Sequence, residues 1–238
     1  MSKAQLIVAL DVETFDEASR LIDDLGDSVE IFKVGSQMFT AQGPFSTRYL
    51  QSKGKKVFLD LKFHDIPNTV ASAVKSAVSL SVSPNNDPGF APLFMLTVHT
   101  AGGKEMLEAA AQAAQMQAKA LGVQRPLIVG VTVLTSTAKD VGTQELVLER
   151  ARLAKEAGLD GVVASVEEAA AIRQSLGQDF LIVTPGIRPA EASLNDQKRV
   201  ATPKGAIEQG SNFLVVGRPI IQAASPRAAA LKILEEIK

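Results

Sequence analysis

The chain has 238 residues, 46% of them hydrophobic and 21% charged, so it can bury a sizeable core and does not belong to the disordered class. The 25 lysines and arginines nearly balance the 26 aspartates and glutamates, and the net charge of −1 gives no electrostatic reason to expect nucleic-acid or membrane partners. Without cysteine there is no disulfide, thiolate metal site or cysteine nucleophile, and two histidines are too few for a histidine-rich metal site. No apolar run approaches a membrane-spanning length and no cleavable signal pattern is present, so we expect a soluble cytoplasmic protein.

Short apolar runs recur along the whole chain, and each strand-plus-helix unit takes about 30 residues. Most of these runs are continuously apolar, which is typical of parallel strands covered on both faces. The eight expected strands are Gln5–Leu10, Glu30–Val34, Lys56–Leu61, Leu93–Val98, Leu127–Val131, Asp160–Ala164, Phe180–Val183 and Asn212–Val216.

Helical patterns lie between these strands, with apolar residues at three- and four-residue spacing. In Gln144–Ala157 the expected stripe is Leu146, Arg150, Leu153 and Ala157. Alternation of strand and helix over the whole length predicts one α/β domain, residues 1–238, and eight units favour a closed (β/α)8 TIM barrel over an open sheet. The expected helices are Asp16–Leu25, Lys104–Leu121, Gln144–Ala157, Glu167–Leu176 and Pro226–Ile237.

One stretch, Ser81–Pro92, contains three prolines and an Asn-Asn turn pair, so we expect it to be a loop. It precedes the fourth strand and is therefore expected at the N-terminal face of the barrel. Chemistry in such barrels takes place at the opposite face, where an insertion of this kind does not interfere.

Charged residues gather where the first three strands end. Asp11 follows the first strand, Lys33 lies near the end of the second, and the third runs into Asp60, Lys62 and Asp65. Asp60 and Lys62 are two residues apart on a strand, so we expect their side chains to share one face. On that segment alone, a structural ion pair and a catalytic pair are equally good interpretations. A structural ion pair does not require two lysines and three aspartates in one cleft, so the catalytic interpretation is favoured.

The loops after the seventh and eighth strands suggest a phosphate site. Gly186 and Arg188 follow the seventh strand, and Gly217, Arg218 and Pro219 follow the eighth. Glycine allows close approach of the backbone, arginine supplies a bidentate cation, and proline suits the first turn of a helix. Either turn alone is ordinary loop chemistry, but two such turns on adjacent strands favour phosphate binding.

The remaining polar residues give weaker signals. We expect His64 to form only local hydrogen bonds and His99 to be structural. Thr135, with Ser136, is placed to cap the following helix. Nothing in the pattern alone singles out Gln197.

These motifs together resemble the orotidine 5′-phosphate decarboxylase family, whose members convert orotidine 5′-monophosphate (OMP) to UMP and CO₂ in de novo pyrimidine biosynthesis. The matching segments occur in the family's order over nearly the entire chain, and the Asp-x-Lys-x-x-Asp spacing is highly specific. The family fold is a barrel whose active sites lie at a dimer interface. The segments are Val8–Asp11, Lys33–Gly35, Phe58–Thr69, Thr184–Pro189, Asp196-Gln197 and Val216–Pro219.

The resemblance implies a role for Lys62, Asp60 and Asp65 in the reaction. Lys62 would deliver a proton to C6 of the pyrimidine as CO₂ leaves, and Asp60 would lie against the substrate carboxylate. Asp65 would enter from the partner subunit of a homodimer to hold Lys62. No cofactor is expected because the sequence has no cofactor motif, and no metal is expected because cysteine is absent, histidine is scarce and a lysine stands at position 33.

The same resemblance implies the substrate-binding residues. Asp11 and Lys33 would bind ribose hydroxyls together with the partner's Thr69, Ile66 would also contact substrate, and Thr135 would face the pyrimidine. The base edge and phosphate would be surrounded by Arg188, Gln197, Gly217 and Arg218.

Two other functions fit parts of the pattern. A sugar-phosphate aldolase or keto-acid phosphate decarboxylase on this scaffold shares the Asp-x-Lys-x-x-Asp segment, but such relatives use Mg²⁺ and place an acid where this chain has Lys33. A noncatalytic nucleotide-phosphate binding protein would not need Asp60, Lys62 and Asp65. Loss of CO₂ from a ring carbon without an electron sink requires a preplaced cation, and a lysine flanked by aspartates meets that need.

Overall fold

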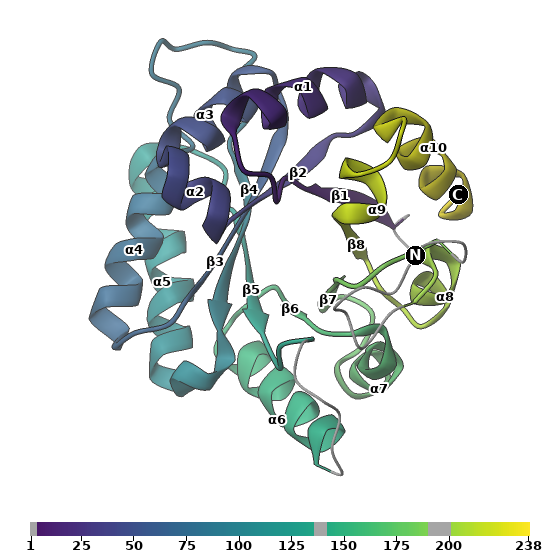
Figure 1. Ribbon diagram of the computed structural model, residues 1–238. Coiled ribbons are helices and arrows are strands. Elements are labelled where there is room, and N and C mark those ends of the chain that lie inside the picture. The colour runs from purple at the N-terminus through teal and green to yellow at the C-terminus, as the bar shows by residue number, and fades with distance from the viewer. Residues whose placement is uncertain (1–3, 136–141, 190–200) are drawn as a thin grey trace.

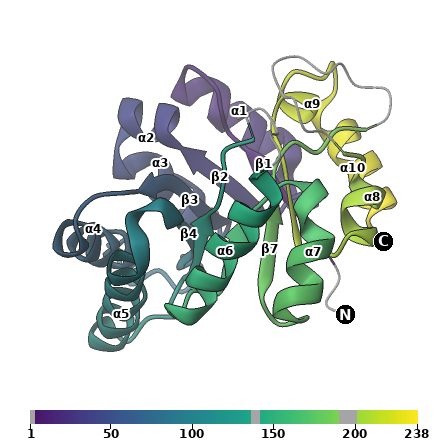
Figure 2. The ribbon, with the colours of Figure 1, turned by 90° about the horizontal axis from the view of Figure 1, so that it is seen from below.

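The computed structural model describes residues 4–135, 142–189 and 201–238. Its eight parallel strands close into a barrel in the order β1 to β8, and the helices form a ring outside it (Figures 1 and 2), so the predicted (β/α)8 fold is confirmed. Every predicted strand is present within two residues of its expected bounds. The strands are β1 Gln5–Ala9, β2 Ile31–Gly35, β3 Lys56–Phe63, β4 Leu93–His99, β5 Leu127–Val131, β6 Gly161–Val163, β7 Leu181–Thr184 and β8 Phe213–Val216.

The five predicted helices are confirmed within one residue at each end as α1 Phe15–Leu25, α5 Gly103–Leu121, α6 Thr143–Glu156, α7 Val166–Leu176 and α10 Pro226–Glu236. Five further helices in the described ranges were not predicted. They are α2 Ser36–Gln42, α3 Pro44–Ser52, α4 Pro67–Ser79, α8 Pro203–Glu208 and α9 Arg218–Ile221. Four of them have nine residues or fewer and are too short to show periodicity, whereas α4 carries a buried stripe that was not recognised in the sequence, formed by Val70, Val74, Ala77 and Val78.

The buried face of α6 differs from the predicted stripe. Val147, Ala151 and Ala154 are buried there, whereas Leu146 is exposed. A Cβ added to Gly130 of β5 would come within 3.4 Å of the Ala154 methyl, so this helix packs closely against the barrel. Leu146 is therefore wrong as a member of the buried stripe, because close packing selects small side chains over large ones, whereas the predicted Ala157 is buried and Leu153 packs against the core.

Side chains that alternate along the strands fill the interior of the barrel, as in other barrels of this type. The inner cluster is apolar and includes Ile7, Phe58, Met95 and Val129. The next inward-facing residues along β2, β3 and β4 are Lys33, Asp60 and Thr97, which the same alternation places at the C-terminal end of the interior. Because side chains alternate along the strands, these polar groups lie at the mouth of the barrel.

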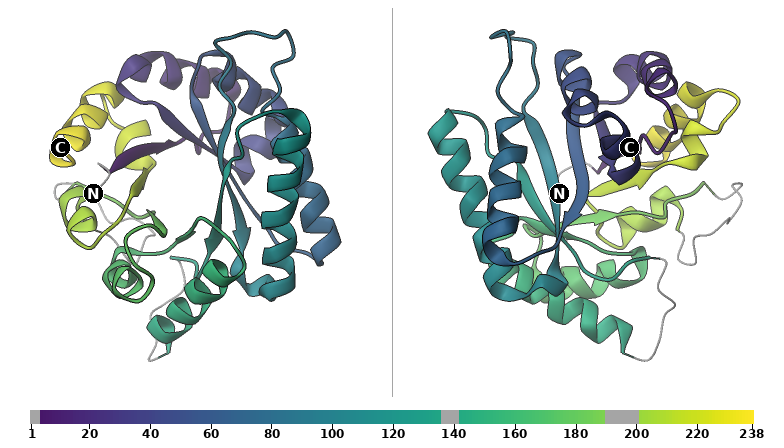
Figure 3. Two further views of the ribbon diagram at one scale, coloured as in Figure 1. Left: turned by 180° about the vertical axis from the view of Figure 1, so that it is seen from behind. Right: turned by 60° about the vertical axis from the view of Figure 1, so that its left-hand side comes forward.

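The segment before β4 forms a loop without helix or strand, as predicted (Figure 3). It lies against α3, where Ala91 donates its backbone N–H to the Gln51 carbonyl at 2.9 Å and Arg48 reaches the Val82 carbonyl. Because this loop leads into the beginning of β4, it lies at the end of the barrel opposite the polar groups. Among the described residues no helix is both long enough and apolar enough to cross a membrane.

Candidate active site

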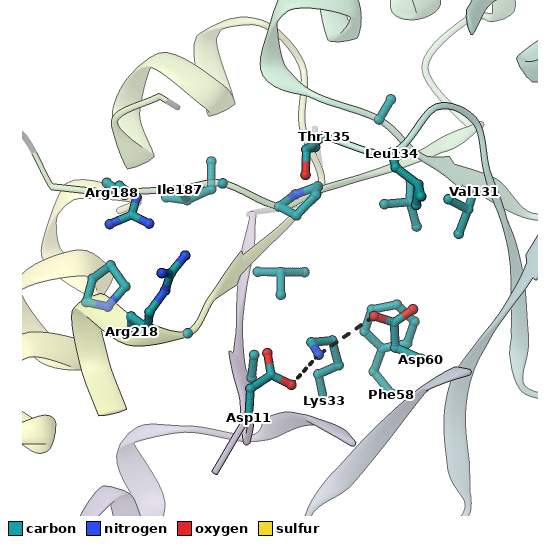
Figure 4. A pocket seen from close by; sticks show the side chains of 18 of the residues that line it. Asp11, Lys33, Phe58, Asp60, Val131, Leu134, Thr135, Ile187, Arg188 and Arg218 are labelled. Carbon is teal, nitrogen blue, oxygen red and sulfur yellow. Dashed lines mark hydrogen bonds and ion pairs between the residues drawn. The ribbon is translucent and has the colours of Figure 1, made fainter. Parts of the chain in front are cut away.

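Four charged side chains alternate in sign around the mouth of the barrel. The ammonium of Lys33 lies 2.9 Å from Asp11 Oδ1 and 3.7 Å from Asp60 Oδ2 (Figure 4). The ammonium of Lys62 lies 2.8 Å from the same Asp60 oxygen. Asp60 and Lys33 are buried, whereas Asp11 and Lys62 are partly open to solvent. We call these four residues the charge array.

The backbone of β3 leaves regular strand geometry within this array. Leu59 pairs with Leu96 of β4 and Phe63 with Val98, so three residues of β3 face the single residue Thr97. Such a bulge re-aims side chains and often lies beside an active site. Lys62 has a φ of 51°, a left-handed conformation that is uncommon for residues other than glycine. Asp60 and Lys62 therefore meet as predicted, but through a bulge and not through simple alternation.

A cavity of about 480 Å³ opens above the charge array, within the size range of small-ligand sites. Across it from Asp11 and Asp60, Arg188 reaches in from the loop after β7 and Arg218 from the first residue of α9, after β8 (Figure 4). Thr135 lies along a third side, beyond the end of β5. One wall is thus alternately charged and the facing wall is cationic, which suits a ligand with an anionic group at one end.

Two glycines shape this site. A Cβ at Gly35 would lie 2.9 Å from the Lys33 ammonium nitrogen and 3.1 Å from Asp11 Oδ1, so the missing side chain leaves room for that ion pair. Gly186 has a φ of 77°, which glycine adopts without strain, and it turns the chain so that buried Arg188 reaches the cavity wall. A Cβ at Gly217 would lie 3.6 Å from the Ala9 methyl, an ordinary van der Waals contact, so the space left by the described residues does not exclude a side chain there.

The predicted site residues separate into two groups. The cavity is lined by Asp11, Lys33, Asp60, Lys62, Thr135, Arg188, Gly217 and Arg218. In contrast, Asp65, Ile66 and Thr69 are exposed and do not line it, and Ile66 shows 66% of its surface. No ion pair within the described part of this single chain joins Asp65 to Lys62, and Asp65 instead accepts the Ile66 backbone N–H at 2.7 Å.

Two further predictions concern loop residues. Thr135 lines the cavity and does not cap the next helix, whose N-terminal flanking residue is Gly142, so that capping prediction is wrong. Gln197 and Ser136 lie outside the described residues.

The apolar part of the cavity was missed by reasoning from charge. Its floor and side include Phe58, Val131, Val163, Leu134 and Val215. Four of these point inward because they alternate with buried outward-facing residues on their strands. That alternation was available in the sequence as a signal, but continuously apolar strands conceal which residues face the interior.

The two histidines lie together beside the site. Their rings stack with centroids 5.2 Å apart, and His99 Nδ1 accepts the Ala101 backbone N–H at 3.2 Å. Burial, followed by the electrostatic interaction with His64, lowers the pKa of His99 from its ordinary value. This contact fits the structural role expected for His99.

The chemistry of the donor groups bears on whether a metal would fit. No group of three or more histidine, aspartate or glutamate side chains in the described ranges is placed to hold a metal ion. The ammonium of Lys33 occupies the space between Asp11 and Asp60, so these two carboxylates already have a cation between them. The site does not match the oxygen-rich environment that Mg²⁺ requires.

Comparison with known proteins identifies relatives along the whole chain. The model of the "Orotidine 5'-phosphate decarboxylase / HUMPS family" matches residues 4–233. A protein named orotidine 5′-phosphate decarboxylase from Moorella thermoacetica is 47% identical, and the match covers 100% of this chain and 93% of the relative. Its namesake from Geobacter sulfurreducens is 46% identical, and the match covers 99% of this chain and 97% of the relative. The crystal structure of orotidine 5′-phosphate decarboxylase from Lactobacillus acidophilus superposes with a TM-score of 0.83 at 37% identity, covering 99% of both chains. With its barrel, its charge array and full-length relatives, the chain belongs to the orotidine 5′-phosphate decarboxylase / HUMPS family.

Proposed function

We propose that the protein decarboxylates OMP to UMP and CO₂, with Lys62 as the proton donor. The observation that carries this proposal is the charge array, in which an ammonium lies 2.8 Å from a buried carboxylate at the mouth of a cavity. In the reaction the bond between C6 and the carboxylate breaks, and its electron pair remains on C6. Lys62 transfers a proton from Nζ to that carbon, and solvent restores the lysine to its ammonium form. No cofactor takes part in any step.

Electrostatic stabilisation supplies the catalysis in this proposal. A vinyl-type carbanion has no resonance sink in the pyrimidine ring, so a positive charge must already be in place when CO₂ leaves. Lys62 is held by Asp60, and Asp60 lies between the two lysines of the array. This arrangement aims Lys62 at the reacting carbon, while Asp60 lies against the departing carboxylate.

Ribose and phosphate bind away from the reacting carbon. Asp11 and Lys33, joined at 2.9 Å, present one acceptor and one donor to the ribose hydroxyls. On the facing wall Arg188 and Arg218 bind the phosphate, with the Gly217 backbone close to it. Thr135, which lines the cavity, contacts the base. Binding energy from these remote groups lowers the barrier at C6.

The active site is completed by a second copy of the chain in a homodimer. Asp65, Ile66 and Thr69 follow β3 at the same end of the barrel as the cavity, yet they point into solvent instead of the cavity. A partner subunit placed against this surface would bury Ile66 and bring its own Asp65 to Lys62. Each site then contains Asp60 and Lys62 of one chain and Asp65 of the other.

The metal-dependent aldolases and decarboxylases that share this scaffold are the main rival. The position of Lys33 between two carboxylates opposes a divalent cation in the same place. Enzyme treated with EDTA should therefore consume OMP, measured by its loss of absorbance, and release UMP and CO₂ in equal amounts. Activity that is lost in EDTA and restored by Mg²⁺ would favour the rival. No turnover under any condition would favour a nucleotide-binding protein without catalysis.

A further inference from the structure

The bulge in β3 is closed by one hydroxyl group from the neighbouring strand. Thr97 of β4 is fully buried and is the only residue of that strand facing Asp60, Leu61 and Lys62. Its Oγ1 accepts the backbone N–H of Lys62 at 2.8 Å and donates to Asp60 Oδ1 at 3.1 Å. A single side chain is thus bonded to both members of the pair at the reacting end of the charge array.

The first of these hydrogen bonds replaces a backbone ladder bond that the bulge removes. A bulged strand loses regular ladder bonds to its neighbour, and a buried N–H without a partner costs about 1–3 kcal/mol. Thr97 gives the Lys62 N–H an acceptor at the position where Lys62 takes its left-handed φ. The backbone conformation that aims Lys62 at the cavity therefore depends on this hydroxyl.

The second hydrogen bond orients the carboxylate. Asp60 Oδ2 receives the ammonium of Lys62 at 2.8 Å, while Oδ1 receives the Thr97 hydroxyl. With both oxygens occupied by donors on different strands, rotation of the carboxylate about its terminal torsion is blocked. The plane of Asp60 is fixed before any substrate arrives.

We propose that Thr97 is a positioning residue for decarboxylation, which fixes the orientation of Asp60 and the backbone of Lys62 without touching the substrate. This inference rests on the proposed function. It predicts that loss of the hydroxyl affects turnover far more than binding, because misplacement of catalytic groups by about 1 Å can cost 10²-fold in rate.

The test compares Thr97→Val with Thr97→Ser and with the matched control Thr100→Val. Valine keeps the shape of threonine without its hydroxyl, and serine keeps the hydroxyl. Thr100 is equally buried, but its hydroxyl donates at 2.8 Å to the Val131 backbone carbonyl and not to the charge array. We expect kcat of Thr97→Val to fall about 100-fold with UMP affinity changed by less than about threefold. Thr97→Ser and Thr100→Val should retain kcat within about threefold of wild type.

Several results would overturn the inference. A kcat for Thr97→Val within threefold of that for Thr100→Val would mean that the hydroxyl is only structural. If Thr97→Val does not fold, Thr97→Cys replaces it: its thiol is a weak hydrogen-bonding group, so turnover should lie at least about tenfold below Thr97→Ser, and equal values would contradict the proposal. Wild-type enzyme that does not consume OMP would overturn the proposed function and this inference with it, whereas active wild type with unaffected variants would overturn the inference alone.

Discussion

The two walls of the cavity are built differently. The wall formed by β1, β2 and β3 carries its charges on the strands or directly after them, and its members hold one another at 2.8–3.7 Å. The facing wall carries Arg188 and Arg218 on the segments after β7 and β8. The strands of the barrel fix side-chain geometry better than the loop that carries Arg188 or the four-residue helix α9 that begins at Arg218, so we infer a division of labour: the charge array performs chemistry and the arginines bind substrate.

Removal of the proposed proton donor should produce the largest effect. Lys62→Ala is expected to lower kcat by more than about 10³-fold, because proton transfer by a positioned group contributes roughly 10²–10⁴-fold. Steady-state turnover of OMP measures this. Lys56→Ala is the matched control, since Lys56 lies on the same strand but pairs with Glu30 at the surface, at 3.1 Å. If Lys62→Ala keeps a tenth or more of wild-type kcat, Lys62 is not the proton donor.

Mixing two inactive variants tests whether the charged wall is shared between subunits. Lys62→Ala and Asp65→Ala homodimers should each be nearly inactive. After an equal mixture is unfolded and refolded together, about half the dimers are mixed, and one site in each mixed dimer carries neither lesion. Roughly a quarter of wild-type activity should therefore return. Absence of recovery, with mixed dimers shown to be present, would place Asp65 in its own chain's site.

Loss of a phosphate contact should weaken substrate use by a smaller factor. Arg218→Ala is expected to cost about 2–3 kcal/mol in kcat/KM for OMP, or roughly 30- to 150-fold, as is typical for a charge-assisted hydrogen bond. The loss should be much smaller for orotidine, which lacks the phosphate. Arg227→Ala on α10 serves as the control because it lies outside the cavity. Equal losses with both substrates would make Arg218 a structural residue.

Adding a methyl group at Gly35, beside the ion pair between Lys33 and Asp11, should lower activity least of the four changes. In Gly35→Ala the new Cβ would push the Lys33 ammonium away from its 2.9 Å position, and the end of a flexible side chain yields easily. Thermal unfolding should therefore change little, while kcat/KM falls by about tenfold through the displaced ribose-binding pair. A large drop in melting temperature with unchanged kcat/KM would show that Gly35 serves packing.

The sequence predicted more of the fold than of the detailed site geometry. Eight strands and the charges at their ends could be read along the chain, because strand alternation and barrel architecture are regular. The bulge opposite Thr97 could not, since it depends on the register between two strands whose side chains meet only in the folded barrel. Likewise, no local pattern shows that Gly35 makes room for Lys33 and Asp11. Side-chain chemistry was visible in the sequence, and the contacts that aim it were not.

The division of labour between the two walls is tested most directly by titrating UMP into Lys62→Ala and Arg218→Ala by calorimetry, beside their kcat values for OMP. UMP keeps the ribose and phosphate but has lost the carboxylate, so it reports on binding without chemistry. We expect Lys62→Ala to bind UMP within about threefold of wild type while turnover collapses. Arg218→Ala should lose UMP affinity by at least about tenfold and retain far more turnover at saturating OMP. Loss of UMP affinity in Lys62→Ala as large as in Arg218→Ala would contradict the account, because the charge array would then be a binding element like the arginines.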